Sequence, residues 1–88
     1  MKLTRKHSKS KEEVREALDS IAGDMQKKFG IGHKWEGETL RFNGNLVSGY
    51  IANSGDEITV DLKKSFFLPV PESTLKGWVE EYFNKYLG

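Results

Sequence analysis

The sequence contains no cysteine, which excludes disulfide bonds, thiolate nucleophiles and cysteine metal sites. The fold must therefore depend on apolar burial and backbone hydrogen bonds, as suits a reducing compartment. No apolar run approaches the ~20 residues needed to span a bilayer, so no transmembrane segment is expected. The basic N-terminus is followed by no apolar stretch, so we expect no secretory signal. Together these absences predict a cytoplasmic protein.

The sequence also has few prolines and a small net charge. The two prolines, Pro69 and Pro71, fall in one segment, and the net charge of +1 gives no strong overall field for nucleic acid or anionic lipid. The 88 residues suit a single domain, 1–88. The charge is nevertheless uneven, because a run of basic residues precedes the first acid, Glu12: Lys2, Arg5, Lys6, Lys9 and Lys11.

The first half of the chain predicts a strand and a long helix. Residues 2–8 alternate as an edge strand on which lysines discourage pairing with another chain. Ser10 and Glu13 form a capping box, and apolar residues then recur at helical spacing up to Gly30, a typical C-terminal stop. We predict a helix over 11–29.

The middle of the chain predicts four antiparallel strands. Residues 33–36, 39–43, 46–53 and 57–62 are separated by turn signals, of which Asn43-Gly44 favours a tight turn with positive φ. In 57–62, Ile58, Val60 and Leu62 should face inward. For 46–53 two inward faces stay open: Val47, Gly49 and Ile51, or Leu46, Tyr50 and Ala52.

The end of the chain predicts an irregular segment and a second helix. The segment 63–71 is apolar but carries both prolines, whereas 73–87 has a wide apolar stripe at helical spacing. The order is β-α-β-β-β-β-α. The fold class is therefore α+β, with an antiparallel sheet and two amphipathic helices packed on one face.

No template for catalysis or metal binding is present. His7 and His33 are the only histidines, and no His-x-x-x-His or Glu-x-x-His spacing occurs. The serines lack a nucleophile elbow, and Gly30-Ile31-Gly32 follows a helix and does not open one. We predict no enzyme activity, no metal and no cofactor; a small hydrolase or isomerase using His7 and Arg5 ranks last.

Two binding hypotheses remain. The basic N-terminal strand, with Arg41 and nearby aromatics, would suit nucleic acid, which is the alternative function. The leading function is a non-enzymatic binding protein, because apolar residues gather before and on the last helix. A protein partner, a second copy, an apolar ligand or an apolar surface would contact Phe66, Phe67, Leu68, Val70, Trp78 and Tyr82.

Several stretches, in this order and spacing, resemble the polyhydroxyalkanoic acid system protein family: Leu3-x-Arg5-x-His7-Ser8, Lys28-Phe29-Gly30-Ile31, Trp35-Glu36-Gly37-x-Thr39-Leu40-x-Phe42, Val47-x-Gly49 and Leu75-Lys76-Gly77. The resemblance covers nearly the whole chain. It implies a small bacterial cytoplasmic protein linked to polyhydroxyalkanoate granules, and it implies no catalytic residue. The prolines of 66–73 depart from the family pattern. The element order is also similar to a reduced helix-grip fold, as a fold-level analogy only.

Overall fold

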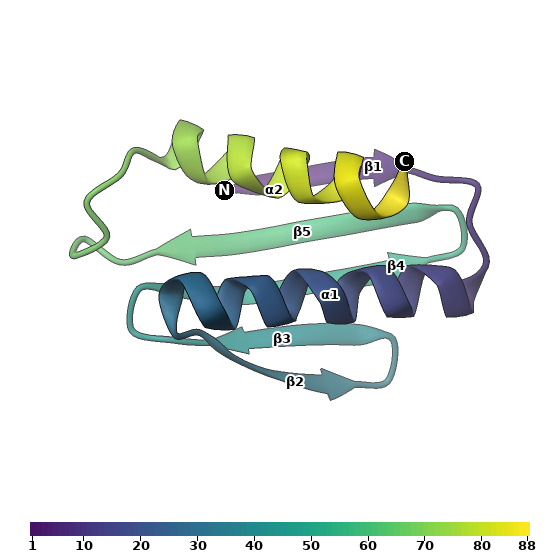
Figure 1. Cartoon of the computed structure of the whole chain (residues 1–88), viewed down its shortest axis with the longest axis horizontal. Coiled ribbons are helices and arrows are strands. Elements are labelled where there is room, and N and C mark those ends of the chain that lie inside the picture. Colours follow the sequence, from purple (N-terminus) through teal and green to yellow (C-terminus); the bar gives the residue numbers. More distant parts are fainter.

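The computed structural model describes all residues, 1–88, and divides them into five strands and two helices (Figure 1). No helix is long and apolar enough to cross a membrane. The order along the chain matches the predicted α+β class. The elements are β1 (Lys2–Lys6), α1 (Lys11–Phe29), β2 (Gly32–Glu36), β3 (Thr39–Asn43), β4 (Val47–Ser54), β5 (Glu57–Lys64) and α2 (Glu72–Leu87).

The five strands form one antiparallel sheet in the order β1-β5-β4-β3-β2. Strands β2 to β5 are a meander, and β1 pairs with β5 so that Leu3 lies opposite Val60. The predicted edge strand therefore lies at one edge, and β2 forms the other. In β5 the apolar residues alternate with polar ones, which places Ile58, Val60 and Leu62 in the core.

Both helices lie on the same face of the sheet and run side by side in opposite directions (Figure 1). Helix α1 begins at the predicted capping box, in which the Glu13 amide donates to Ser10 Oγ and the Ser10 amide donates to Glu13 Oε1, both at 3.1 Å. It ends at Gly30, whose φ of 66° is the left-handed conformation that favours glycine. The bounds predicted for this helix are confirmed.

The core between helices and sheet is entirely apolar. No polar or charged residue is buried, and no buried side-chain polar atom lacks a partner. Such a core specifies the fold by shape and burial alone. Its 19 residues are Val14, Ala17, Leu18, Ile21, Ala22, Met25, Ile31, Leu40, Phe42, Val47, Ile51, Ile58, Val60, Leu62, Leu68, Leu75, Val79, Phe83 and Leu87.

Strand β4 resolves the alternative that the sequence leaves open. Val47 and Ile51 are buried, whereas Tyr50 and Ala52 lie on the helix-free face. Between the two buried residues, Gly49 has a φ of 137°, and a Cβ there would lie 2.0 Å from the Asp61 carbonyl oxygen. Only glycine lets β4 approach β5 this closely.

Three local predictions need correction. The edge strand predicted over residues 2–8 ends at Lys6, so β1 is two residues shorter than expected. Strand β5 continues through Lys63 and Lys64, which pair with Ser48 and Val47, so the irregular segment is two residues shorter than expected. The turn after Asn43 lies where predicted, but neither Asn43 nor Gly44 has positive φ. The connection is three residues long, and Gly44 is close-packed: its Cβ would lie 3.0 Å from the Val47 carbonyl oxygen.

Candidate functional site

The connection between β5 and α2 contains a tight turn that displays two phenylalanines. In this turn, Ser65–Leu68, the Leu68 amide donates to the Ser65 carbonyl at 3.1 Å. The Phe67 amide donates to Ser65 Oγ, also at 3.1 Å. Phe66 and Phe67 therefore occupy the two central positions of a hydrogen-bonded turn. We call Ser65–Leu68 the phenylalanine turn.

The two rings are the large apolar side chains that the fold leaves in solvent. Phe66 is 93% exposed and Phe67 is 80% exposed. Their centroids are 5.9 Å apart at an interplanar angle of 82°, an edge-to-face arrangement. The connection between β5 and α2 that carries the pair lies beyond the end of the sheet, at one end of the long axis of the molecule (Figure 1). Neither ring plugs the open end of the core.

The phenylalanine turn is attached to the core at both ends. The Ser65 amide donates to the Leu46 carbonyl at 2.7 Å, which ties the turn to the β3–β4 connection. At the other end, Leu68 turns inward and is 5% exposed. Leu68 was predicted as a contact residue, but its burial corrects that role, because it anchors the turn and offers no surface to a partner.

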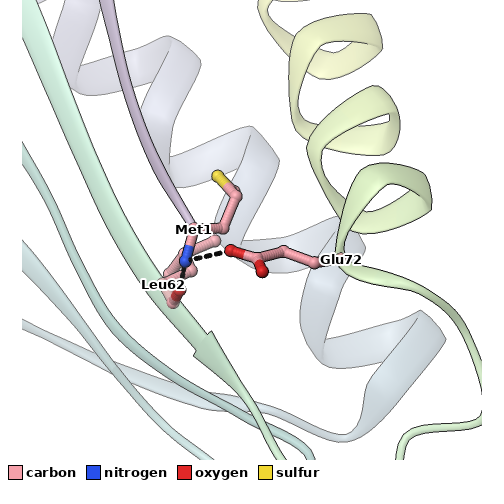
Figure 2. A network of polar contacts seen from close by, with 3 residues as sticks. All are labelled: Met1, Leu62 and Glu72. Carbon is pink, nitrogen blue, oxygen red and sulfur yellow. Dashed lines mark hydrogen bonds and ion pairs between the residues drawn. The ribbon is translucent and has the colours of Figure 1, made fainter.

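The N-terminal amine joins the strand before the turn to the helix after it. The Met1 ammonium donates to the Leu62 carbonyl at 2.7 Å and pairs with Glu72 Oε1 at 2.6 Å (Figure 2). Glu72 is the first residue of α2, so its charge also suits the positive end of that helix. The hydrogen bond from the ammonium, and then its charge, hold the pKa of Glu72 below its ordinary value. The sequence carries no signal for this contact.

The other predicted contact residues are packed against neighbouring elements. Val70, Trp78 and Tyr82 are half-buried. The Trp78 ring lies 5.2 Å from that of Phe29, and the Lys28 ammonium lies 4.7 Å from the Trp78 centroid. Burial, and then the charge of Asp24, raise the pKa of Tyr82. These residues support the helix pair, and only part of each reaches solvent.

The predicted basic patch is dispersed. Lys2 and Lys6 lie on the helix-free face, whereas Arg5 turns to the helices and donates to Asn84 Oδ1 at 2.8 Å. Lys11 pairs with Glu38 at 3.1 Å, and Lys9 lies beside Glu13. Because strand alternation separates Arg5 from Lys2 and Lys6, and acids lie beside Lys9 and Lys11, the five predicted residues do not form one continuous basic surface.

His7 is held in a hydrogen-bonded position. Its Nδ1 accepts from the Lys9 amide at 3.1 Å, so its Nε2–H donates to Asn53 Oδ1 at 2.9 Å. The ring lines neither of the two surface hollows of the molecule. The neighbouring Arg5 is directed to α2. The geometry thus gives His7 a structural role and does not join it to Arg5 at a cleft.

The hollows are small and mostly polar. The larger, about 260 Å³, lies between the start of α1 and the end of α2, and the smaller, about 120 Å³, lies beside the β3–β4 connection. The helix-grip analogy would need an apolar ligand cavity between the helices and the sheet. Neither hollow lies there. No group of three or more His, Asp or Glu side chains could hold a metal ion. His33 is exposed on the edge strand β2. The exposed phenylalanine pair remains the clearest candidate site.

Sequence reasoning missed the lysines that accompany this pair. Lys63 and Lys64 end β5 directly before the phenylalanine turn, and both line the smaller hollow. The signal was present in the sequence as the run Lys-Lys-Ser-Phe-Phe. The sequence analysis assigned both lysines to an irregular segment, whereas the structure places them at the end of β5.

The comparisons with known proteins give one result. The family model described as polyhydroxyalkanoic acid system protein (PHA_gran_rgn) matches residues 1–87, which is nearly the whole chain. No curated protein and no solved structure matches.

Proposed function

The chain belongs to the polyhydroxyalkanoic acid system protein family, and from this membership we propose that it is a non-enzymatic accessory protein that attaches to the surface of polyhydroxyalkanoate granules. The observation that carries the proposal is the exposure of Phe66 and Phe67, at 93% and 80%. A folded domain with an otherwise complete core has no need to leave two adjacent phenyl rings in water. We expect the protein to act in the cytoplasm.

The attachment works through burial of the two rings. Transfer of a phenylalanine side chain from water to an apolar phase is worth about 1.5–3 kcal/mol, so two rings supply about 3–6 kcal/mol before the entropic cost of binding. The phenylalanine turn reduces that cost, because its hydrogen bonds and the buried Leu68 already fix the backbone. The contact is therefore weak to moderate and reversible.

The test is co-sedimentation of the purified protein with protein-free polyhydroxyalkanoate granules. We expect Phe66→Ser/Phe67→Ser to lower the affinity by more than about tenfold. A factor of ten in affinity corresponds to about 1.4 kcal/mol, which is less than the contribution expected from the two rings. The matched control is Tyr50→Ser, which removes a half-buried ring from the helix-free face. Circular dichroism confirms that both variants are folded.

The result that overturns the proposal is equally plain. If the double variant sediments with granules as the wild type does, the phenylalanine pair is not the contact. Equal losses in the double variant and in Tyr50→Ser would also overturn it, because the effect would then have no particular place on the molecule.

A further inference from the structure

The phenylalanine turn lies at the basic end of the molecule. Lys63 and Lys64 directly precede it, and Lys27 and Lys28 close α1 at the same end of the long axis (Figure 1). Lys63, Lys27 and Lys28 are exposed, and Lys64 is half-buried. The Lys28 ammonium lies over the Trp78 ring, 4.7 Å from its centroid. The exposed side chains of Lys27 and Lys63 are long enough to carry their charge outward while their stems cover apolar surface.

The acids at this end are already engaged. Asp24 Oδ2 accepts from the Tyr86 hydroxyl at 2.6 Å, and Glu72 pairs with the Met1 ammonium. Acidic residues instead gather toward the other end of the long axis, where α1 begins and where β2–β3 and β4–β5 turn (Figure 1). These are Glu12, Glu13, Glu16, Glu38, Asp56 and Glu57. Lys6, Lys9, Lys11 and Arg15 lie at that same end and offset most of its acidic charge, whereas the four lysines outnumber Asp24 and Glu72 at the end that carries the phenylalanine turn.

We propose that the surface met by Phe66 and Phe67 is an anionic phospholipid layer, on which the molecule docks end-on. The two rings enter the apolar region while Lys63 and Lys64, two residues and one residue before Ser65, meet the phosphates. Lysines near an anionic surface add to apolar insertion, and the two together give stable attachment where either alone is marginal. An uncharged polyester would use the rings and leave the lysines without a partner.

This inference rests on the proposed function, because it names the chemistry of the surface that the same turn contacts. The experiment uses the full chain and sedimentation with vesicles of phosphatidylcholine alone or mixed with phosphatidylglycerol, next to the protein-free granules. Lys63→Gln/Lys64→Gln keeps most of each side chain and removes the charge. The matched control is Lys6→Gln/Lys9→Gln, an exposed pair away from the phenylalanine turn.

We expect binding to the anionic vesicles that weakens at high salt and falls roughly fivefold per lysine, or about 25-fold, in Lys63→Gln/Lys64→Gln. We expect Lys63→Arg/Lys64→Arg to bind the anionic vesicles as the wild type does, because the charge is kept. Lys6→Gln/Lys9→Gln should change this binding little. Equal binding to neutral and anionic vesicles, or equal losses in the two glutamine pairs, overturns the inference.

The failure of this inference differs from failure of the proposed function. If the wild type binds granules through the phenylalanines but binds no vesicle, the anionic surface is wrong and granule attachment stands. If Phe66→Ser/Phe67→Ser binds granules and vesicles as well as the wild type does, both the proposed function and this inference are wrong. A concentration-dependent dimer that Phe66→Ser/Phe67→Ser dissociates, without vesicle binding, would instead assign the rings to a second copy and overturn the lipid contact.

Discussion

The carboxylate of Glu72 lies 2.6 Å from the Met1 α-amino nitrogen, although the two residues are 71 positions apart (Figure 2). The same ammonium donates to the Leu62 carbonyl. One charged group thus joins the end of β5 to the start of α2, and these two elements are connected by the segment that carries the phenylalanine turn. The contact restrains the base of the candidate site from a distant part of the sequence.

The first prediction concerns the pH dependence of this pair. Folding lowers the pKa of Glu72 below its ordinary value of 4.5, so the pair stabilises the folded state above that pH. The contribution is lost as the pH falls through the lowered pKa. We expect Glu72→Gln to melt below the wild type at pH 7, and the difference between their Tm values to close below about pH 4.5. Thermal melts from pH 7 to pH 3 measure it.

The control for this prediction is a chain with one extra glycine before Met1. The amine becomes an amide, which has no charge to offer Glu72. Glu72→Gln should then lower the Tm less than it does in the chain with a free amine. An equal Tm change in both chains would show that Glu72 acts through the helix end and not through the amine.

The second prediction concerns Gly49. A Cβ there would lie 2.0 Å from the Asp61 carbonyl oxygen, and the φ of 137° is strained for any other residue. We expect Gly49→Ala to lower the free energy of unfolding by about 2–5 kcal/mol, from strain and overpacking together. Urea denaturation measures it. A loss below 1 kcal/mol would mean that β4 can move away from β5 at little cost.

The sequence predicts this fold well because local signals and burial agree. The capping box, Gly30 and the alternation of Ile58, Val60 and Leu62 each specify an element whose apolar face then has one core to join. The inward face of β4 could not be predicted, because both faces carry apolar residues. Which face of β4 turns inward depends on how the strand pairs with β5, whose backbone Gly49 approaches closely.

The candidate site was predictable only in part. The apolar character of Phe66 and Leu68 is visible in the sequence, but their opposite fates depend on a turn that directs one outward and the other inward. The Met1–Glu72 pair could not be predicted, since it joins residues at a large sequence separation without a motif. The dispersal of the basic N-terminal residues likewise follows from the strand alternation and from partners such as Asn84.

The third prediction concerns glycines without a packing role. An added Cβ at Gly23 in α1 or at Gly77 in α2 would meet no atom within 4 Å. Because glycine costs a helix about 1 kcal/mol relative to alanine, Gly23→Ala and Gly77→Ala should each raise the free energy of unfolding by about 0.4–1 kcal/mol. Thermal melts should show an increase in Tm of a few degrees for each. A decrease would reveal a close neighbour in the folded protein.

The fourth prediction joins stability to attachment through Leu68. Its side chain is buried at the end of the phenylalanine turn, so Leu68→Ala removes the inward anchor without touching the exposed rings. We expect a loss of about 2–4 kcal/mol in the free energy of unfolding and weaker granule binding at a temperature where the variant is still folded. Leu68→Met, which nearly conserves volume, should cost less than about 1.5 kcal/mol and bind granules normally.

The reason is that a loosened turn must be ordered again at the surface, and this cost is taken from the binding free energy of the rings. Granule sedimentation at 10 °C, with circular dichroism to confirm folding, separates this effect from simple unfolding. If Leu68→Ala is destabilised but binds granules as well as the wild type, pre-organisation of the turn contributes nothing. Attachment would then depend only on the presence of Phe66 and Phe67, however they are held.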